Sequence, residues 1–156
     1  LCNPAGVDRQ LMGIFDGSFT EKVAKVLKKL GSSHAMVVHG DDGLDEMSTT
    51  ASTQVSRLKN DGSIDTISIS AADYGFEAAT LDDLKGGMPD ENAEIVKNIL
   101  NGSDVGKKAD IVILNAAAGI FVGGMVENIE EGISTAREAI GSGAAMNILV
   151  ELAAVK

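Results

Sequence analysis

The chain has 156 residues, a length typical of one domain. Hydrophobic residues make up 44% of it and charged residues 23%, which excludes global disorder, and because only 3% are aromatic the core must rely on aliphatic side chains. The net charge of −10 argues against nucleic acid or an anionic membrane surface as the main partner, because phosphate binding needs clustered Lys and Arg.

The first part of the chain predicts a β-α-β unit. The apolar run at residues 11–15 predicts a buried strand, and Ser18 and Glu21 have the spacing of a capping box at the start of a helix. Apolar side chains then recur at helical spacing over residues 21–30, and a second apolar run follows at residues 35–39. We therefore expect two parallel, neighbouring strands joined through the helix by a right-handed crossover.

The middle of the chain predicts a β-hairpin. Residues 54–59 and 63–70 flank a turn at residues 60–62, and Ile67 and Ile69 alternate with Ser and Thr. One face of this hairpin is polar, so we expect it at an edge of the sheet rather than at its centre.

From residue 81 onward the pattern is helical. Residues 81–84 predict a single helical turn, and Pro89 suits the first position of the next helix. Residues 108–122 are nearly apolar all round, which predicts a buried helix. Residues 110–114 alone would fit a buried strand equally well, but the alanines that follow favour a helix. Two further helices are expected, at residues 129–140 and 144–155.

The one group of residues that suggests a functional site is an acidic loop directly after the second predicted strand. Asp41, Asp42, Asp45 and Glu46 place four carboxylates within six residues, at the carboxyl end of a strand, where open α/β folds bind ligands. Mg²⁺ would compensate this charge, since it takes hard oxygen ligands and is commonly held by one or two carboxylates plus substrate phosphates. A solvated surface loop explains the same residues without a ligand, and the spacing matches neither an EF-hand nor a P-loop.

At this loop the sequence resembles the anthranilate phosphoribosyltransferases. The loop itself matches the acidic motif of that family in His39-Gly40, Gly43, Asp45-Glu46 and Ser48. Further motifs match in the same order and spacing, so that the resemblance covers essentially all 156 residues. These motifs are residues 1–5, 9–13, 83–87, 91–93 and 115–118.

The resemblance implies a reaction and a role for two of the carboxylates. It implies transfer of the phosphoribosyl group of 5-phosphoribosyl 1-pyrophosphate to anthranilate, which forms N-(5-phosphoribosyl)anthranilate and pyrophosphate in tryptophan biosynthesis. By the same resemblance, Asp45 and Glu46 hold Mg²⁺, the implied cofactor, against the pyrophosphate, whose departing negative charge a metal can stabilise. Asp41 and Asp42 remain solvated surface charges. The complete enzyme is expected to be a cytoplasmic homodimer.

Other motifs of the family have no equivalent in this sequence. They are its glycine-rich phosphate loop, its Lys-His-Gly segment and its anthranilate-binding Arg. We therefore expect residues 1–156 to be the carboxyl-terminal portion of an α/β, parallel-sheet domain of the phosphoribosyltransferase and nucleoside-phosphorylase type, without the amino-terminal helical domain. Such a portion should carry the metal-holding edge and no catalytic residue, should be inactive alone, and should leave Leu11, Ile14 and Val37 uncovered.

Two other functions stay open on the same scaffold. One is a non-catalytic relative that binds a ligand or nucleic acid, and the net charge of −10 counts against nucleic acid. The other is an enzyme like the pyrimidine nucleoside phosphorylases, which share the broad fold. Phosphorolysis needs no metal-bridged pyrophosphate, so the pair Asp45 and Glu46 favours the transferase.

The remaining residues with reactive side chains carry weaker expectations. His34 and His39 fit roles at strand ends better than that of a catalytic base. Cys2 lies in a predicted turn with no positioned base, so we do not expect it to be a nucleophile. A single cysteine excludes an internal disulfide and fits a reducing compartment. With no long apolar run and no signal-like start, the sequence favours a cytoplasmic chain without a membrane partner.

Overall fold

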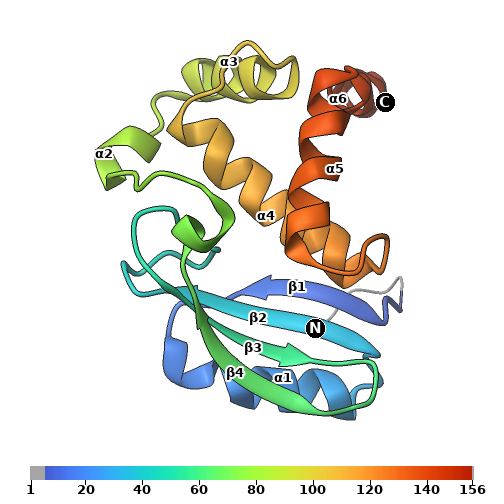
Figure 1. Ribbon diagram of the computed structural model, residues 1–156. Helices are drawn as coiled ribbons and strands as arrows, with labels where there is room; N and C mark the ends of the chain where they lie inside the picture. Colours follow the sequence, from blue (N-terminus) through green and yellow to red (C-terminus); the bar gives the residue numbers. More distant parts are fainter. Residues whose placement is uncertain (1–5, 156) are drawn as a thin grey trace.

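The apolar runs of the first half of the chain pair into one sheet. The computed structural model describes residues 6–155, so that Cys2 and the motif at residues 1–5 lie outside the described residues. Four strands lie side by side in chain order (Figure 1). They are β1 (Arg9–Gly13), β2 (His34–Gly40), β3 (Thr53–Leu58) and β4 (Ile64–Ile69).

Strand pairing confirms the β-α-β unit and the hairpin. β1 and β2 are parallel, with Leu11 opposite Met36, whereas β2–β3 and β3–β4 are antiparallel, so the sheet is mixed rather than wholly parallel. Of the two hairpin strands, β4 lies at an edge of the sheet as predicted, whereas β3 occupies an interior position between β2 and β4, which was not predicted. The expected bounds of the first strand were wrong at its end, because Phe15 is 81% exposed and lies beyond β1.

One face of the sheet is covered by the crossover helix α1 (Thr20–Lys29). Its Ala24 and Leu27 pack with Val37 and Leu58 of the sheet in a small apolar cluster. The expectation that Val37 is uncovered was therefore wrong, since α1 buries it completely. Leu11 and Ile14 are half-buried.

The start of α1 differs from the predicted capping box. The carboxylate of Asp16 accepts a hydrogen bond from the backbone nitrogen of Ser18 at 2.9 Å and begins a short 3₁₀ turn, η1 (Gly17–Phe19). The hydroxyl of Thr20 then donates to the carbonyl oxygen of Gly17 at 3.0 Å. Asp16, two residues earlier, thus takes the capping role predicted for Ser18.

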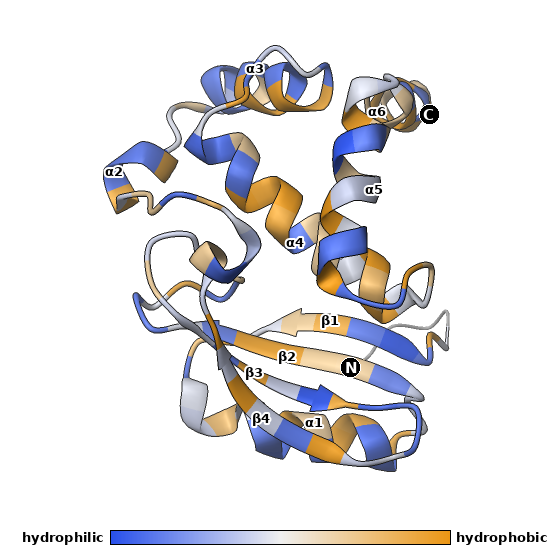
Figure 2. Ribbon diagram, viewed as in Figure 1, coloured by the Kyte–Doolittle hydropathy of each residue, from blue (hydrophilic) through white to orange (hydrophobic). Residues whose placement is uncertain are grey.

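The opposite face of the sheet carries the main core. Helix α4 (Lys107–Gly123) packs on this face against β1 and β2, and α5 (Ile129–Gly141) packs against α4; Figure 2 shows the apolar stripes of β2 and α4. Residues 110–114 lie within α4, so the helical prediction is confirmed and the strand alternative is wrong. Burial all round was wrong, because Val112 on the outer side of α4 is 38% exposed. The central core residues are Met36, Val38, Val55, Leu114, Ala117, Ala118 and Ile133.

Shorter elements complete the helical layer. A 3₁₀ turn, η2 (Ala71–Tyr74), follows the sheet, and Pro89 occupies the predicted first position of α3. None of the helices in the described part of the chain is long and apolar enough to cross a membrane. The remaining helices are α2 (Leu81–Leu84), α3 (Pro89–Leu100) and α6 (Ala144–Ala154).

Candidate metal centre

The acidic loop leaves the carboxyl end of β2 and returns as β3, at the side of the sheet near α2 and the start of α4 (Figure 1). Asp41, Asp45 and Glu46 are exposed along it. Among the residues that the structure describes, neither Asp45 nor Glu46 forms an ion pair with a basic side chain. These two neighbouring carboxylates are therefore free to bind a cation from solvent.

Asp42 has a different role from its neighbours. It is half-buried, and its carboxylate accepts hydrogen bonds from the backbone nitrogen of Leu44 at 3.0 Å, from the hydroxyl of Ser48 at 2.5 Å and from that of Thr50. Burial pushes the pKa of Asp42 upward, but these hydrogen bonds outweigh it and hold the pKa below its usual value. Asp42 thus holds the loop together through hydrogen bonds within it, and the expectation that it is a solvated surface charge was wrong.

Helix α4 holds the loop directly after Glu46. The backbone nitrogen of Met47 donates to Oδ1 of Asn115, and Nδ2 of Asn115 donates to the carbonyl oxygen of Met47, both at 2.9 Å. The same Nδ2 also donates to the carbonyl oxygen of Ile111 at 3.0 Å. The motif at residues 115–118 pointed to Asn115, but nothing in the sequence assigned it a partner.

On the other side, β1 holds the loop at Asp45. A Cβ atom at Gly13, the last residue of β1, would overlap the carbonyl oxygen of Asp45, so that only glycine fits there. A Cβ atom at Gly40 would lie 2.5 Å from Oδ1 of Asp42. Both glycines are thus required by close approach of the loop.

The donor set decides which metal these residues fit. Within residues 6–155 no three or more His, Cys, Asp or Glu side chains gather in a group that could hold a metal ion. Two adjacent carboxylates are too few for a dedicated protein cage, and they lack the nitrogen and sulfur ligands that Zn²⁺ prefers. They fit Mg²⁺, which binds through one or two carboxylates and keeps water or phosphate oxygens as its other ligands.

The two histidines lie at opposite ends of β2, as expected. Nδ1 of His39 donates to the carbonyl oxygen of Ile14 at 2.8 Å and so ties the end of β1 to β2. His34 is 7% exposed and packs edge-on against Phe121; burial, with the nearby charge of Arg9, lowers its pKa. The ring of His34 is thus buried, and Nδ1 of His39 is occupied by a backbone contact, so both histidines have structural roles at the ends of β2.

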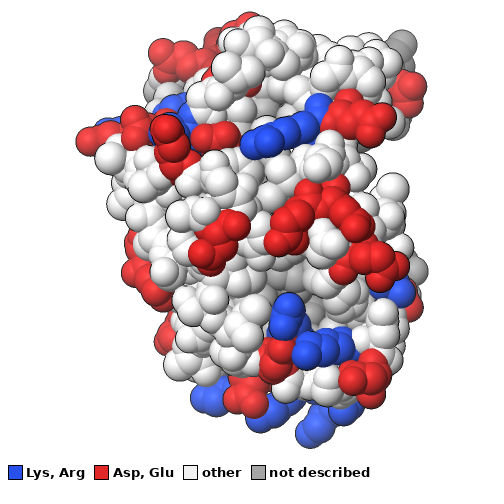
Figure 3. Space-filling model, in the orientation of Figure 1, with Lys and Arg blue, Asp and Glu red and all other residues white. Residues whose placement is uncertain are grey.

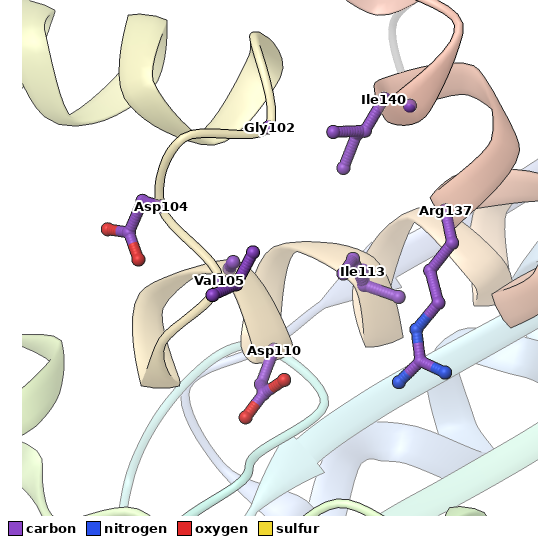
Figure 4. A pocket seen from close by; sticks show the side chains of 9 residues that line it. Gly102, Asp104, Val105, Asp110, Ile113, Arg137 and Ile140 are labelled. Atoms are coloured by element: carbon purple, nitrogen blue, oxygen red, sulfur yellow. The ribbon is translucent and has the colours of Figure 1, made fainter.

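Two hollows adjoin the helical layer. One has a volume of about 370 Å³, is lined by Glu46 and Leu44 from the acidic loop, and continues between α3 and α4. The other, of about 360 Å³, lies between α4 and α5, and Asp110 and Arg137 are among the residues that line it (Figure 4). Burial raises the pKa of Asp110. No residue of the acidic loop lines this second hollow.

The excess of acidic side chains is visible on the surface (Figure 3). Figure 3 shows acidic side chains spread over the face that it displays, and basic side chains along its lower edge, where α1 runs. Four exposed lysines lie on α1, and Lys25 pairs with Glu21 at 2.8 Å. This helix faces away from α4, so its lysines lie on the opposite face of the sheet from the main core.

Comparison with known proteins places these features in a family context. The family described as "Glycosyl transferase family, a/b domain" matches residues 1–146. An anthranilate phosphoribosyltransferase from Clostridium beijerinckii is 46% identical over 156 residues, which are 100% of this chain and 45% of that protein. One from Methanocorpusculum labreanum is 47% identical over 152 residues, 97% of this chain and 44% of that protein. The chain thus spans somewhat less than half the length of these relatives.

Solved structures show the same partial coverage. The crystal structure of anthranilate phosphoribosyltransferase from Thermus thermophilus matches with a TM-score of 0.83 and 33% identity, over 96% of this chain and 43% of that one. The Saccharomyces cerevisiae enzyme in complex with PRPP and Mg matches with a TM-score of 0.76 and 26% identity, over 88% of this chain and 39% of that one. The described fold is therefore that of a part of these larger proteins.

Proposed function

Since this chain belongs to the glycosyl transferase family, a/b domain, we propose that it is the metal-holding, carboxyl-terminal part of an anthranilate phosphoribosyltransferase. The complete enzyme transfers the phosphoribosyl group of 5-phosphoribosyl 1-pyrophosphate to the amino group of anthranilate and releases pyrophosphate. One observation carries the proposal: two adjacent, exposed and unpaired carboxylates, Asp45 and Glu46, stand on a backbone held by both β1 and α4. Relatives of this name at 46% identity support it.

The chemistry of this edge follows from its ligands. Asp45 and Glu46 would hold Mg²⁺, which neutralises negative charge on a leaving pyrophosphate without any proton transfer. Asp42 and Asn115 keep the loop backbone in place. The yeast structure with PRPP and Mg supports this choice of donor and ion. The residues that bind the phosphoribosyl group and anthranilate are proposed to lie in the part of the enzyme outside this chain.

The same proposal includes the setting of the complete enzyme. It is a cytoplasmic homodimer with 5-phosphoribosyl 1-pyrophosphate and anthranilate as its small-molecule partners. The net charge of −10 supports the absence of a nucleic-acid partner, and the single cysteine supports a reducing compartment.

The test compares the complete polypeptide that contains this chain with the 156-residue chain alone. Loss of anthranilate fluorescence is followed with 5-phosphoribosyl 1-pyrophosphate and Mg²⁺. We expect transfer by the complete polypeptide and none by the chain alone, because rate acceleration needs donor and acceptor held together. A complete polypeptide that leaves anthranilate unchanged but cleaves pyrimidine nucleosides with phosphate would overturn the proposal in favour of a phosphorylase. Inactivity in both assays would favour a non-catalytic binding protein.

A further inference from the structure

We propose that Asn115 is a positioning residue for the metal-holding carboxylates, acting together with Gly13. This inference rests on the proposed function, because it assigns Asn115 a task only if Asp45 and Glu46 bind a metal. Asn115 touches neither carboxylate. It acts on the backbone that bears them.

The side-chain amide of Asn115 makes three hydrogen bonds. Its Oδ1 accepts from the nitrogen of Met47, and its Nδ2 donates to the carbonyl oxygen of the same residue, so both polar backbone groups of Met47 are paired with one side chain. The further bond from Nδ2 to Ile111 fixes the amide against its own helix. An amide held at three points cannot rotate, and the peptide beside Glu46 is fixed with it.

Gly13 confines the loop from the opposite side. The carbonyl oxygen of Asp45 lies where any Cβ atom at this position would be, so β1 and the loop are in direct backbone contact. Gly13 of β1 and Asn115 of α4 therefore hold Asp45 and Met47, the residues on either side of Glu46. Both elements pack in the core, and α4 and β1 contact each other directly.

Burial of the loop does not by itself explain why its backbone is held from both sides. Met47 is buried, yet the side chains of Asp45 and Glu46 are exposed and unpaired. A loop that only needs to be soluble gains nothing from a rigid backbone under two free carboxylates. A metal site does, because outer residues that orient its ligands commonly contribute 10- to 100-fold in metal affinity.

The experiment uses the complete polypeptide with Asn115→Ala, and Asn147→Ala as the matched control. Asn147 is an exposed asparagine on helix α6. Calorimetry measures Mg²⁺ binding in the presence of pyrophosphate, and hydrogen exchange measures protection of the Met47 amide. We expect Asn115→Ala to weaken Mg²⁺ binding at least about tenfold and to lose that protection, with the control unchanged.

Kinetics separate positioning from simple destabilisation. We expect Asn115→Ala to need at least about tenfold more Mg²⁺ for half-maximal turnover, to recover most of its rate at saturating Mg²⁺, and to keep its KM for anthranilate. A variant that is merely less folded loses rate at every Mg²⁺ concentration and does not recover. If Asn115→Ala does not fold, Asn115→Gln retains the amide on a longer arm and takes its place in both assays.

Gly13→Ala provides an independent check from the other side of the loop. It should raise the Mg²⁺ requirement in the same way, whereas Gly119→Ala should not, because Gly119 has open space around it. Unchanged Mg²⁺ affinity in the Asn115 variant that folds and in Gly13→Ala would overturn the positioning role. If Asp45→Asn with Glu46→Gln also leaves Mg²⁺ affinity unchanged, the proposed function itself fails with it.

Discussion

The hydroxyl of Ser48 donates a 2.5 Å hydrogen bond to the carboxylate of Asp42, and this contact separates one member of the acidic loop from the rest. Asp42 turns inward and closes the loop, whereas Asp45 and Glu46, a few residues further on, remain exposed. A cluster of four carboxylates thus contains one structural acid and two candidate metal ligands, and they are distinguished by the donors around them rather than by their spacing.

Asp42→Asn should destabilise the fold. Both carboxylate oxygens of Asp42 accept hydrogen bonds, from two hydroxyls and one backbone nitrogen. In asparagine one of these oxygens becomes an NH₂ group, which cannot accept a hydrogen bond. We expect a loss of about 1–3 kcal/mol in the free energy of unfolding, measured by urea denaturation. Asp41→Asn is the matched control on the same loop, and because Asp41 is exposed its effect should stay within about 0.5 kcal/mol. Equal effects of the two variants would contradict the structural role of Asp42.

Replacing Asp45 by Asn together with Glu46 by Gln should act on the metal dependence of turnover. These side chains would hold the ions of the leaving group, so apparent Mg²⁺ affinity should fall at least about tenfold while the KM for anthranilate changes little. Steady-state kinetics of the complete enzyme, titrated with Mg²⁺, measure both quantities, and Asp41→Asn again serves as the control. An unchanged Mg²⁺ dependence would reduce the pair to solvated surface charge.

Local patterns explain what could be predicted from the sequence. The β-α-β unit, the hairpin and the helix over Leu114 and Ala117 follow from periodicity and propensity, which depend on neighbouring residues. The residue that caps the start of the first helix could not be predicted in this way, because Asp16 and Ser18 are both good capping residues and only the path of the chain decides between them. The interior place of β3 depends on its pairing with β2, which no local pattern contains.

The candidate site shows the same limit. Asp45 and Glu46 could be identified because the motif is continuous in the sequence. The role of Asn115 could not, since its partner Met47 is 68 residues away and the contact forms only after α4 packs on the sheet. The motif at residues 115–118 indicated that Asn115 matters, but it did not indicate which residue Asn115 contacts.

Asp65 should make stability depend on pH. Hydrogen bonds and charge from Arg57, at 2.7 Å, and Lys59, at 2.9 Å, lower the pKa of Asp65 from 3.8 to about 2 against the opposing effect of burial. Because the folded pKa is the lower one, the stabilisation is present above pH 3.8 and is lost as pH falls toward 2. Asp65→Asn should therefore destabilise the protein at neutral pH, with a difference that shrinks as pH approaches 2. Urea unfolding of both proteins across this range measures it, and a difference independent of pH would contradict the ion-pair origin.

Two helical glycines should respond in opposite directions to the same substitution. A Cβ atom at Gly132 of α5 would lie 2.6 Å from the carbonyl oxygen of Ala117, so Gly132→Ala must push α5 away from α4. We expect it to cost roughly 1–3 kcal/mol in the free energy of unfolding, as overpacking does. Gly119 lies inside α4 with nothing near the new methyl group, and Gly119→Ala should stabilise by about 0.5–1 kcal/mol because alanine loses less backbone entropy in a helix. Urea unfolding of the pair measures the sign directly. The same sign for both would mean that α4 and α5 do not approach each other as closely as Gly132 and Ala117 require.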